Sequence, residues 1–458
     1  MSPYPSPHRV DEARWHVQIH HDDTAWDALH ADWNELYERS GATPFQSLDW
    51  NIAWWRHYGR PGRLRLVTVR RDGRLVALAP LTLCRQYGHR VLMPLAAAQS
   101  DHTDVLIDRE HAAIAADRLA GALLAEPGWS VLDFPEVMPN GAVGLLAERW
   151  TRLRRREPSS VCLQLPACAP GEFAARFPRR TAGKVRARLR KIEALGLEIR
   201  QVAATESERA IGEMLHLHER QWQGRGINTE HLQPRFAAML ADAAASMIPS
   251  GRAVLTEYRR DDRVVASDLV VVGADWVGAY LYGAEPDLRN AMDVSLMLLS
   301  NDLRLASGLG RQSLSLLRGQ EDYKLKWQPT LVQNERVVLC RSALAASYLA
   351  CVTGRGRLAR LVHSARSWRA RATGSAPPAA PAPARQPEPT TQPARPEPAA
   401  PSARSEPATP GTRDTTAAAS EPGKPDAGTE DTAPAGRKEP GAPGVGPRLL
   451  RPTDVERA

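Results

Sequence analysis

The chain has 458 residues, of which 43% are hydrophobic, and it carries a formal net charge of +8 at pH 7. Its length and apolar content are enough for two cores of ordinary size, which excludes a chain too small or too polar to fold. The positive charge favours an anionic partner, and three classes stay open: a phosphorylated cosubstrate, an acidic lipid surface and nucleic acid. A merely solvated basic surface is the alternative interpretation.

Cysteine spacing and the N-terminal sequence indicate whether a metal is bound and in which cellular compartment the protein resides. The five cysteines show no C-x-x-C spacing and no neighbouring His pair, so we expect neither a structural zinc site nor any other bound metal. The first residues have no basic n-region followed by an apolar h-region, and no apolar run approaches the ~18 residues of a spanning helix. We therefore expect a cytoplasmic protein without disulfides.

The first half of the chain predicts one mixed α/β layer after a Pro-rich start. Apolar residues recur at helical spacing over 24–39, and Ser47 can cap a Trp-rich helix that ends at Gly59. The Asp72-Gly73 turn indicates a hairpin. Further elements are expected as strands at 17–19, 64–69, 75–83, 92–95, 104–107 and 131–134 and as a helix at 111–124. We assign a flexible N-terminus to 1–14 and a domain to 15–168.

The order helix, hairpin, strand, helix, strand recurs over 169–340, which we assign to a second domain. Its hairpin turns about Asp261-Asp262. The expected helices are 179–195, 206–223 and 294–307, and the expected strands are 197–202, 254–259, 264–272, 277–282 and 313–317. The tandem arrangement rests on this order alone, because the two halves share no visible sequence identity.

Two basic segments and a tail complete the chain. From Arg176 to Lys191 there are eight basic residues and no acidic one, on a helix whose apolar stripe docks inward. Nucleic acid is not favoured, because no recognition motif accompanies them. Residues 341–372 form a basic amphipathic segment that either lies on an anionic membrane, at the inner face, or packs on the second domain. Residues 373–458, without aromatics, are predicted to be disordered.

Short motifs spread over 43–327 resemble a known family. They are Pro44-Phe45-Gln46, Trp50 with Trp54-Trp55, Asp72-Gly73 with Pro80-Leu81, Ser100-Asp101 with Asp104, Leu217-His218-Glu219 with Trp222-Gln223-Gly224-Arg225-Gly226, and Arg318-Gly319 with Tyr323-Lys324 and Trp327. Together they look like the GNAT-fold acetyltransferases of the CelD type, which are associated with cellulose and exopolysaccharide biosynthesis and are related to Fem peptidyltransferases. The last motif is the most specific.

This resemblance implies an α/β (α+β) fold of two tandem GNAT-like (acyl-CoA N-acyltransferase) domains with mixed sheets. It also implies transfer of an acyl group from acetyl-CoA or another acyl-CoA to an amine or hydroxyl, with a glycan precursor as one class of acceptor. The chain departs from the pattern in having Leu316-Leu317 before Arg318 and in lacking the Arg/Gln-x-x-Gly-x-Gly/Ala pyrophosphate loop. An aminoacyl-tRNA-dependent Fem-like transferase and a non-catalytic polysaccharide assembly factor remain as alternatives.

Acyl transfer needs a base, an acid for the leaving thiolate and cations for phosphates. Asp268 lies in an otherwise apolar strand, which would raise its pKa and suit it to the base role. The resemblance implies that Tyr323 protonates the thiolate, and Lys324 can hold a phosphate or an acceptor carboxylate. The substrate-binding candidates are Asp101, His218, Arg225, Arg318 and Trp327. Ordinary structural roles, such as a hydrogen-bonded strand-end Asp, a solvated helix face or an amphipathic turn, compete with each assignment.

Overall fold

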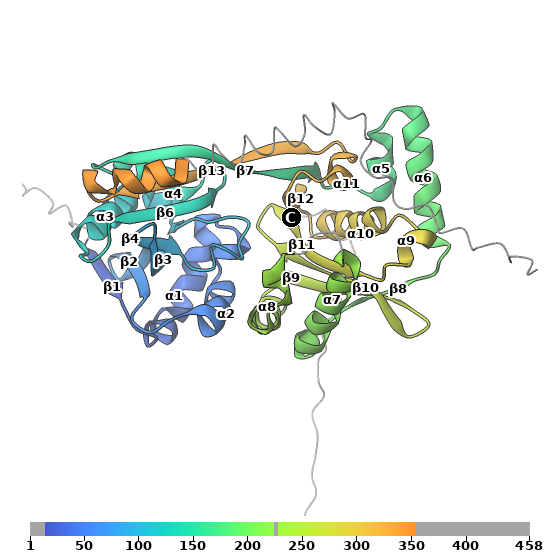
Figure 1. The fold of residues 1–458 in the computed structure, drawn as a ribbon, viewed down its shortest axis with the longest axis horizontal. Helices are drawn as coiled ribbons and strands as arrows, with labels where there is room; N and C mark the ends of the chain where they lie inside the picture. Colours follow the sequence, from blue (N-terminus) through green and yellow to red (C-terminus); the bar gives the residue numbers. More distant parts are fainter. Residues whose placement is uncertain (1–13, 224–227, 354–458) are drawn as a thin grey trace, which may run out of the picture. The chain divides into compact units, whose positions relative to one another are not determined.

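The computed structural model describes residues 14–223 and 228–353, and one mixed β-sheet runs through them (Figure 1). Its strands lie in the order β1 (Trp15–His20), β2 (Leu64–Arg71), β3 (Arg74–Gln86), β4 (His89–Pro94), β6 (Val131–Val137), β13 (Thr330–Cys340), β7 (Arg154–Pro166), β12 (Ser313–Arg318), β11 (Trp276–Ala284), β10 (Arg263–Val272), β9 (Ala253–Arg260) and β8 (Glu198–Gln201), and β5 (Leu106–Ile107) pairs with β3. The predicted mixed α/β class is confirmed.

Helices cover both faces of the sheet in the first half. They are α1 (Ala25–Ser40), α2 (Leu48–Tyr58), α3 (Ala112–Ala125) and α4 (Ala142–Arg149), with short 3₁₀ turns η1 (Pro44–Gln46) and η2 (Arg109–His111). α1 and α2 bury their apolar side chains against one face and α3 and α4 against the other. The Ser47 cap is confirmed, because its hydroxyl accepts a bond from the Trp50 N–H. The hairpin is also confirmed, with Asp72 at φ 48° and Gly73 at φ 84°.

The second half repeats this connectivity. Its helices are α5 (Pro170–Ala175), α6 (Arg179–Glu193), α7 (Ser207–Trp222), α8 (Pro234–Met247), α9 (Leu288–Ala291), α10 (Val294–Gly308) and α11 (Asp322–Leu325), with η3 (Ala204–Glu206) and η4 (Thr229–Leu232). In each half two antiparallel pairs lead into a parallel pair joined by a helix: β4 and β6 through α3, and β11 and β12 through α10. This shared topology supports the tandem interpretation.

Two long strands join the halves. β7 pairs with β12 at one end and with β13 along most of its length, while β13 pairs with β6 on its other side. Figure 1 shows β7 and β13 running side by side from one half to the other. Residues 330–340, assigned above to the second domain, therefore lie next to a strand of the first, and the boundaries 15–168 and 169–340 stay a prediction.

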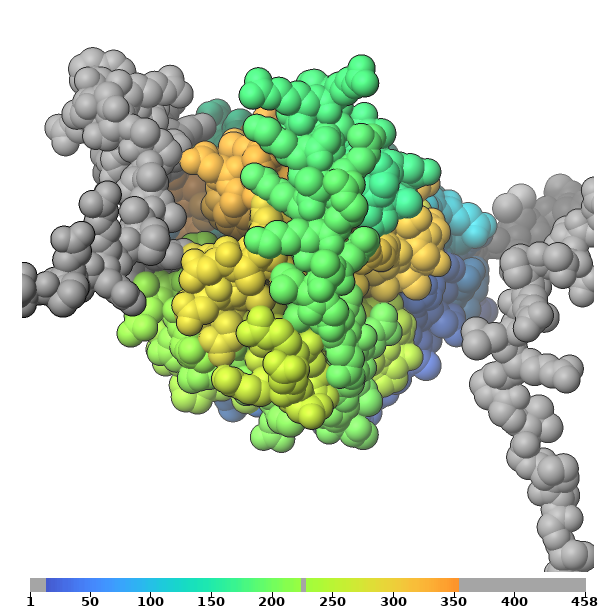
Figure 2. Space-filling model, turned by 90° about the vertical axis from the view of Figure 1, so that its right-hand side faces the viewer, coloured from blue at the N-terminus to red at the C-terminus, as the bar shows by residue number. Residues whose placement is uncertain are grey.

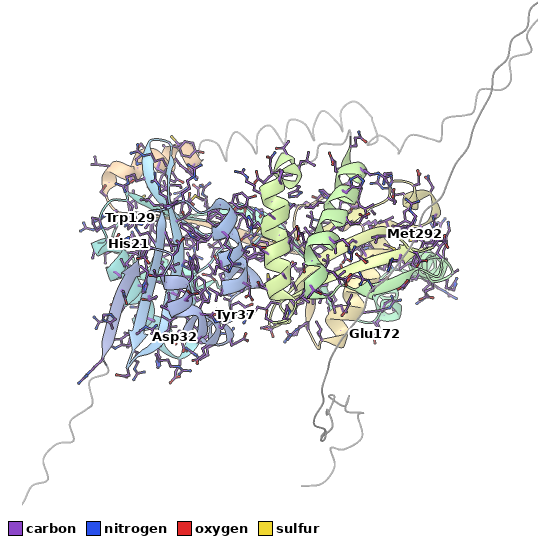
Figure 3. All side chains as sticks on the ribbon, turned by 90° about the horizontal axis from the view of Figure 1, so that it is seen from below. His21, Asp32, Tyr37, Trp129, Glu172 and Met292 are labelled. Carbon is purple, nitrogen blue, oxygen red and sulfur yellow. The ribbon has the colours of Figure 1, made fainter. Side chains whose placement is uncertain are left out.

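The halves also meet through α1, α2 and α8. The guanidinium of Arg252 lies 4.5 Å from the ring centroid of Tyr37, which Figure 3 labels on α1. The same guanidinium donates to Glu38 at 2.9 Å and to Asp49 at 3.0 Å. Such charged contacts fix the orientation of neighbouring elements more than they stabilise the fold.

After β13 the chain turns back onto the first half. A turn η5 (Ala343–Ala345) leads into residues that bury Tyr348 and Val352 against Val91 of β4 and Val131 of β6. The same residues also pack against Val338 and Cys340 of β13, so the described part of the 341–372 segment contacts both the first half and the residues assigned to the second domain. The remainder of that segment, residues 1–13 and the predicted disordered tail lie outside the described residues. Within the described ranges, no helix is long and apolar enough to cross a membrane.

Candidate functional site

The sheet splits open between β11 and β12. These parallel strands pair from Trp276 with Ser313 to Gly278 with Ser315, and their register ends there. The following residues of both strands, from Ala279 on β11 and from Leu316 on β12, line two adjoining hollows. The two hollows therefore adjoin each other at the split.

Irregular backbone produces the split. On β11, Tyr280 is an extra residue between the partners of Leu269 and Val270 on β10. On β12 the register shifts at Leu316 and Leu317, and Leu317 has a left-handed φ of 55°. Bulges bend a strand and release backbone groups from the ladder. The unusual Leu316-Leu317 pair is thus the place where β12 turns away from β11.

The two hollows differ in character. The first, which we call the cavity, has a volume of about 160 Å³ and lies against α10, and its lining residues include five leucines, two tryptophans and three tyrosines. The second, which we call the groove, has a volume of about 850 Å³ and is lined by Trp54 and Tyr58 of α2 as well as by Arg318 of β12. Lys324 and Tyr280 line both. The cavity suits an apolar or acyl chain, and the groove suits a larger polar molecule.

A pair of buried carboxylates lies at the cavity. Asp268 on β10 and Asp302 on α10 are 4% and 3% exposed, beside the fully buried Tyr258 of β9. Burial raises the pKa of Asp268, and contacts with Asp302 and Tyr258 oppose that effect. Burial and repulsion from Asp268 raise the pKa of Asp302 well above its usual range. The pair therefore holds protons at pH values where exposed carboxyls have lost them.

Two histidines form a chain beside the cavity. His218 Nδ1 donates to the carbonyl oxygen of Tyr282 at 2.7 Å, and His218 Nε2 lies 3.3 Å from His231 Nδ1. Burial lowers the pKa of His218, and burial together with His218 lowers the pKa of His231 to about 4. Both rings are therefore neutral at pH 7, so His218 anchors α7 to β11 without adding charge to the cavity.

The α11 turn supplies an amine and a phenol. Lys324 Nζ donates to the carbonyl oxygen of Arg318 at 2.8 Å and pairs with Glu321 at 3.1 Å. Burial, followed by the neighbouring Tyr282, raises the pKa of Tyr323. Tyr323 therefore stays protonated and can donate its hydroxyl hydrogen into the cavity.

Arg318 is held by carboxylates of the first half. Its Nε lies 2.5 Å from Asp101 Oδ1 and its Nη1 lies 3.6 Å from Glu136 Oε1. Asn334 of β13 donates to Glu136 as well, at 3.0 Å. Arg318 and Asp101, both predicted to bind substrate, are thus partners of each other at the edge of the groove.

Aromatic and charged side chains form the far wall of the groove. Trp54 and Tyr58 stack with ring centroids 5.7 Å apart and planes 5° from parallel. Trp54 Nε1 donates to Gln99 at 2.9 Å, and the Tyr58 hydroxyl donates to Glu230 at 2.7 Å. Stacked rings with fixed polar neighbours are suited to binding a flat or ring-shaped polar group.

The N-terminus of α10 is already occupied by a side chain. The carboxylate of Asp293 accepts from the Leu296 N–H at 3.2 Å and pairs with Lys326 at 3.1 Å and with Arg188 of α6 at 3.2 Å. Burial opposes ionisation, but Lys326, the Ser295 hydroxyl and the Leu296 N–H lower the pKa of Asp293. Asp293 thus takes a position where a phosphate would otherwise bind a helix N-terminus.

Cations are nevertheless abundant beside that terminus. Figure 2 looks onto the face crossed by α6, and all eight basic residues from Arg176 to Lys191 are exposed. Ala182, Val185 and Leu189 are buried, which confirms the predicted docking stripe. Any phosphate group at this end of the cavity would meet α6 rather than free backbone N–H groups.

The structure brings most predicted site residues together. His218, Asp268, Tyr323, Lys324 and Trp327 line the cavity. Asp101, Arg318 and Lys324 line the groove. Trp327 is only 4% exposed and also packs with Phe173 and Phe177 in the core. Arg225 lies outside the described residues.

Sequence reasoning missed three residues of the site. Asp302 lies on a helix predicted only from its apolar period, and a single carboxyl in such a helix gives no sign of its burial. Tyr280 stands out only through strand register, which the sequence does not display. His231 follows a helix end in a polar stretch, and nothing in the sequence indicates that its ring contacts His218. Within 14–223 and 228–353, no group of three or more His, Cys, Asp or Glu residues is arranged to hold a metal ion.

Comparison with known proteins identifies this arrangement. Residues 179–325, which include β9 to β12 and α10, match the family model Acetyltransferase (GNAT) domain. The fold is a GNAT fold. No curated protein matches the chain.

Several solved structures are similar to this chain at low sequence identity. FemX is similar over 72% of this chain and 99% of its own, with 10% identity and a TM-score of 0.50. The C-terminal domain (DUF2156) of a putative lysylphosphatidylglycerol synthetase from Agrobacterium fabrum is similar over 72% and 96%, with 11% identity and a TM-score of 0.44. A tandem GNAT protein from the clavulanic acid biosynthesis pathway is similar over 70% and 98%, with 12% identity and a TM-score of 0.34.

Proposed function

We propose that the protein is an acyltransferase that moves an acyl group from acyl-CoA, such as acetyl-CoA, to an amine or hydroxyl of an acceptor. The observation that carries this proposal is the split between β11 and β12, where the cavity adjoins the groove. The two hollows share Ala279, Tyr280, Leu281, Leu316 and Lys324. A donor in the cavity and an acceptor in the groove can meet beside these shared residues at reaction distance.

The cavity fits the acyl end of the donor. Its walls are mainly apolar, and the bulge at Tyr280 leaves a residue outside the β10 ladder whose backbone is a candidate for binding the thioester oxygen. The phosphate end finds Asp293 at the N-terminus of α10, so we assign phosphate binding to Arg188, Lys326 and the exposed cations of α6. This arrangement explains how the chain could use acyl-CoA without the usual pyrophosphate loop.

The chemistry of transfer follows from the residues at the split. The acceptor nitrogen or oxygen attacks the thioester carbonyl carbon, the carbon–sulfur bond breaks, and the acceptor loses one proton. We assign proton acceptance to Asp268 and protonation of the departing thiolate to Tyr323, which burial keeps in its neutral form. Lys324 lines both hollows and orients the α11 turn through its bond to the Arg318 carbonyl.

The acceptor is proposed to be a glycan precursor of polysaccharide or cell-envelope biosynthesis, as in proteins of the CelD type. The stacked Trp54 and Tyr58 and the polar groups of Gln99 and Glu230 support a ring-bearing polar acceptor. We place the protein in the cytoplasm, in peripheral contact with the inner membrane face. The exposed cations of α6 support an anionic surface as a partner.

Calorimetric titration of the full chain with acetyl-CoA, together with release of free thiol from acetyl-CoA in the presence of amino-sugar acceptors, tests the function. Tyr323→Phe should lower kcat for thiol release by ~100-fold while leaving donor binding nearly unchanged. Tyr87→Phe, the same change in the β3–β4 turn of the first half, is the matched control. Absence of binding and of thiol release with every acceptor would refute the proposal.

A further inference from the structure

The α6 helix carries a dense set of cations without counter-ions. From Arg176 to Lys191 the chain has eight basic residues and no acidic one, and all eight side chains are exposed. Within the described ranges, Arg188 alone among them pairs with a carboxylate, at 3.2 Å from Asp293. Figure 2 shows α6 running over the surface of this face. So much unpaired positive charge on one exposed helix indicates an anionic partner.

Helical geometry sorts the unpaired cations of α6 into two stripes. With 3.6 residues per turn, three of them fall within about 40° of one another around the helix axis and point about 150° away from the buried stripe of α6. We call this stripe the crest, and it consists of Arg180, Lys184 and Lys191. A second stripe points sideways, about 90° from the buried stripe. We call it the flank, and it consists of Arg179, Arg186 and Arg190.

The crest has the shape and composition of a surface for a planar anionic partner. Its three cations extend over about 16 Å along the helix axis and point nearly straight outward, so a flat surface that approaches α6 meets them first. No residue of α6 lines the cavity or the groove, and α6 contains no aromatic residue. Single-stranded nucleic acids are bound by stacking bases on aromatic side chains, whereas an anionic bilayer is bound by clustered cations alone.

We propose that the crest of α6 docks the protein on an anionic phospholipid bilayer. This assignment, which rests on the proposed function for its biological context, names the surface through which the peripheral membrane contact is made. The donor side of the site is attached to the same helix, because Arg188 of α6 and Lys326 both pair with Asp293 at the N-terminus of α10. Docking through the crest therefore brings this end of the cavity towards the lipid headgroups.

The first arm of the test measures vesicle binding without donor or acceptor. The full chain is sedimented with vesicles of phosphatidylcholine alone or of phosphatidylcholine mixed with phosphatidylglycerol. We expect binding only to the phosphatidylglycerol vesicles, and we expect it to weaken as salt is added. The crest variant Arg180→Gln/Lys184→Gln/Lys191→Gln should bind them ~100-fold more weakly, because each cation near such a surface contributes about fivefold.

The matched control removes the same charge from the same helix. The flank variant Arg179→Gln/Arg186→Gln/Arg190→Gln loses three cations that point sideways, so its vesicle binding should weaken by less than ~10-fold. Both variants should fold, because glutamine is a good helix former and the buried stripe of α6 is unchanged. Circular dichroism and a cooperative thermal transition verify this.

The second arm tests nucleic acid as the partner, by fluorescence anisotropy with a labelled single-stranded RNA. Loss of RNA binding in the crest variant, with its vesicle binding intact, assigns the crest to nucleic acid and overturns the proposal. Equal weakening of vesicle binding by the crest and flank variants, or no binding of wild type to phosphatidylglycerol vesicles, also overturns it. If vesicles bind as expected but acetyl-CoA neither binds nor releases thiol, the proposed transfer fails while the docking surface stands.

Discussion

Gly283 sets the distance between β11 and α7, and replacing it with alanine tests how the site is positioned. A Cβ at this position would lie 2.2 Å from the carbonyl oxygen of Met214 and 2.5 Å from the backbone nitrogen of His218. Both are backbone atoms, so no side-chain rotation relieves the overlap. α7 must move by about 1 Å to restore an ordinary contact. We expect Gly283→Ala to lower the free energy of unfolding by ~1–3 kcal/mol.

The same displacement should affect the site, because α7 carries His218 and Trp222 at the cavity. A shift of ~1 Å in positioning groups can cost ~100-fold in rate. Urea denaturation followed by circular dichroism measures stability, and the thiol-release assay measures transfer. Gly212→Ala on the exposed side of α7, where an added Cβ meets nothing within 4 Å, should instead stabilise by ~0.5–1 kcal/mol. An unfolding midpoint and activity unchanged by Gly283→Ala would refute the reasoning.

Three further changes have defined outcomes. Arg318→Met leaves the carboxylates of Asp101 and Glu136, whose side chains are 13% and 10% exposed, without their cation. It should lower the free energy of unfolding in urea by ~3–5 kcal/mol, and Arg318→Lys should lower it by less. Because the folded-state pKa values of Asp268 and Asp302 are raised, the native state binds more protons than the unfolded chain above the ordinary Asp pKa, and stability falls as pH rises through the raised values. Asp302→Asn should therefore gain stability over wild type, and the gain measured by thermal unfolding should be larger at pH 8 than at pH 5. Trp54→Leu should raise KM for a glycan acceptor about tenfold and leave acetyl-CoA affinity unchanged in calorimetry.

Local signals were sufficient for the hairpins and for the helices that frame the cavity. Asp72-Gly73 and Asp261-Asp262 adopt positive φ, which two-residue hairpin turns demand. The apolar period of 294–307 placed α10 within one residue of its observed bounds. The polar residues after β12 were recognised as a candidate site because charge and aromatic groups follow a buried strand. These features are encoded by neighbours in the sequence.

Long-range pairing was not visible in the same way. β7 opens with Arg154-Arg155-Arg156 and contains Pro158, so its sequence does not alternate like a strand. It is a strand because β13 pairs with it from more than 160 residues away. The bulge at Tyr280 and the meeting of Asp268 with Asp302 likewise depend on register between separate elements. Tertiary partners decide such features, and a single sequence does not reveal them.

The GNAT domain of the second half needs the first half to complete its site. β12 receives its second hydrogen-bonding partner from β7, so the segment 179–325 alone would expose an open strand edge at the split. Arg318 at the end of β12 is neutralised by Asp101 and Glu136, and the Tyr280 hydroxyl donates to the carbonyl oxygen of Gln99. The first half thus holds both strands at the split, β11 and β12, and provides the aromatic wall of the groove. This dependence explains why one sheet runs through the two halves and why a lone GNAT domain would not suffice here.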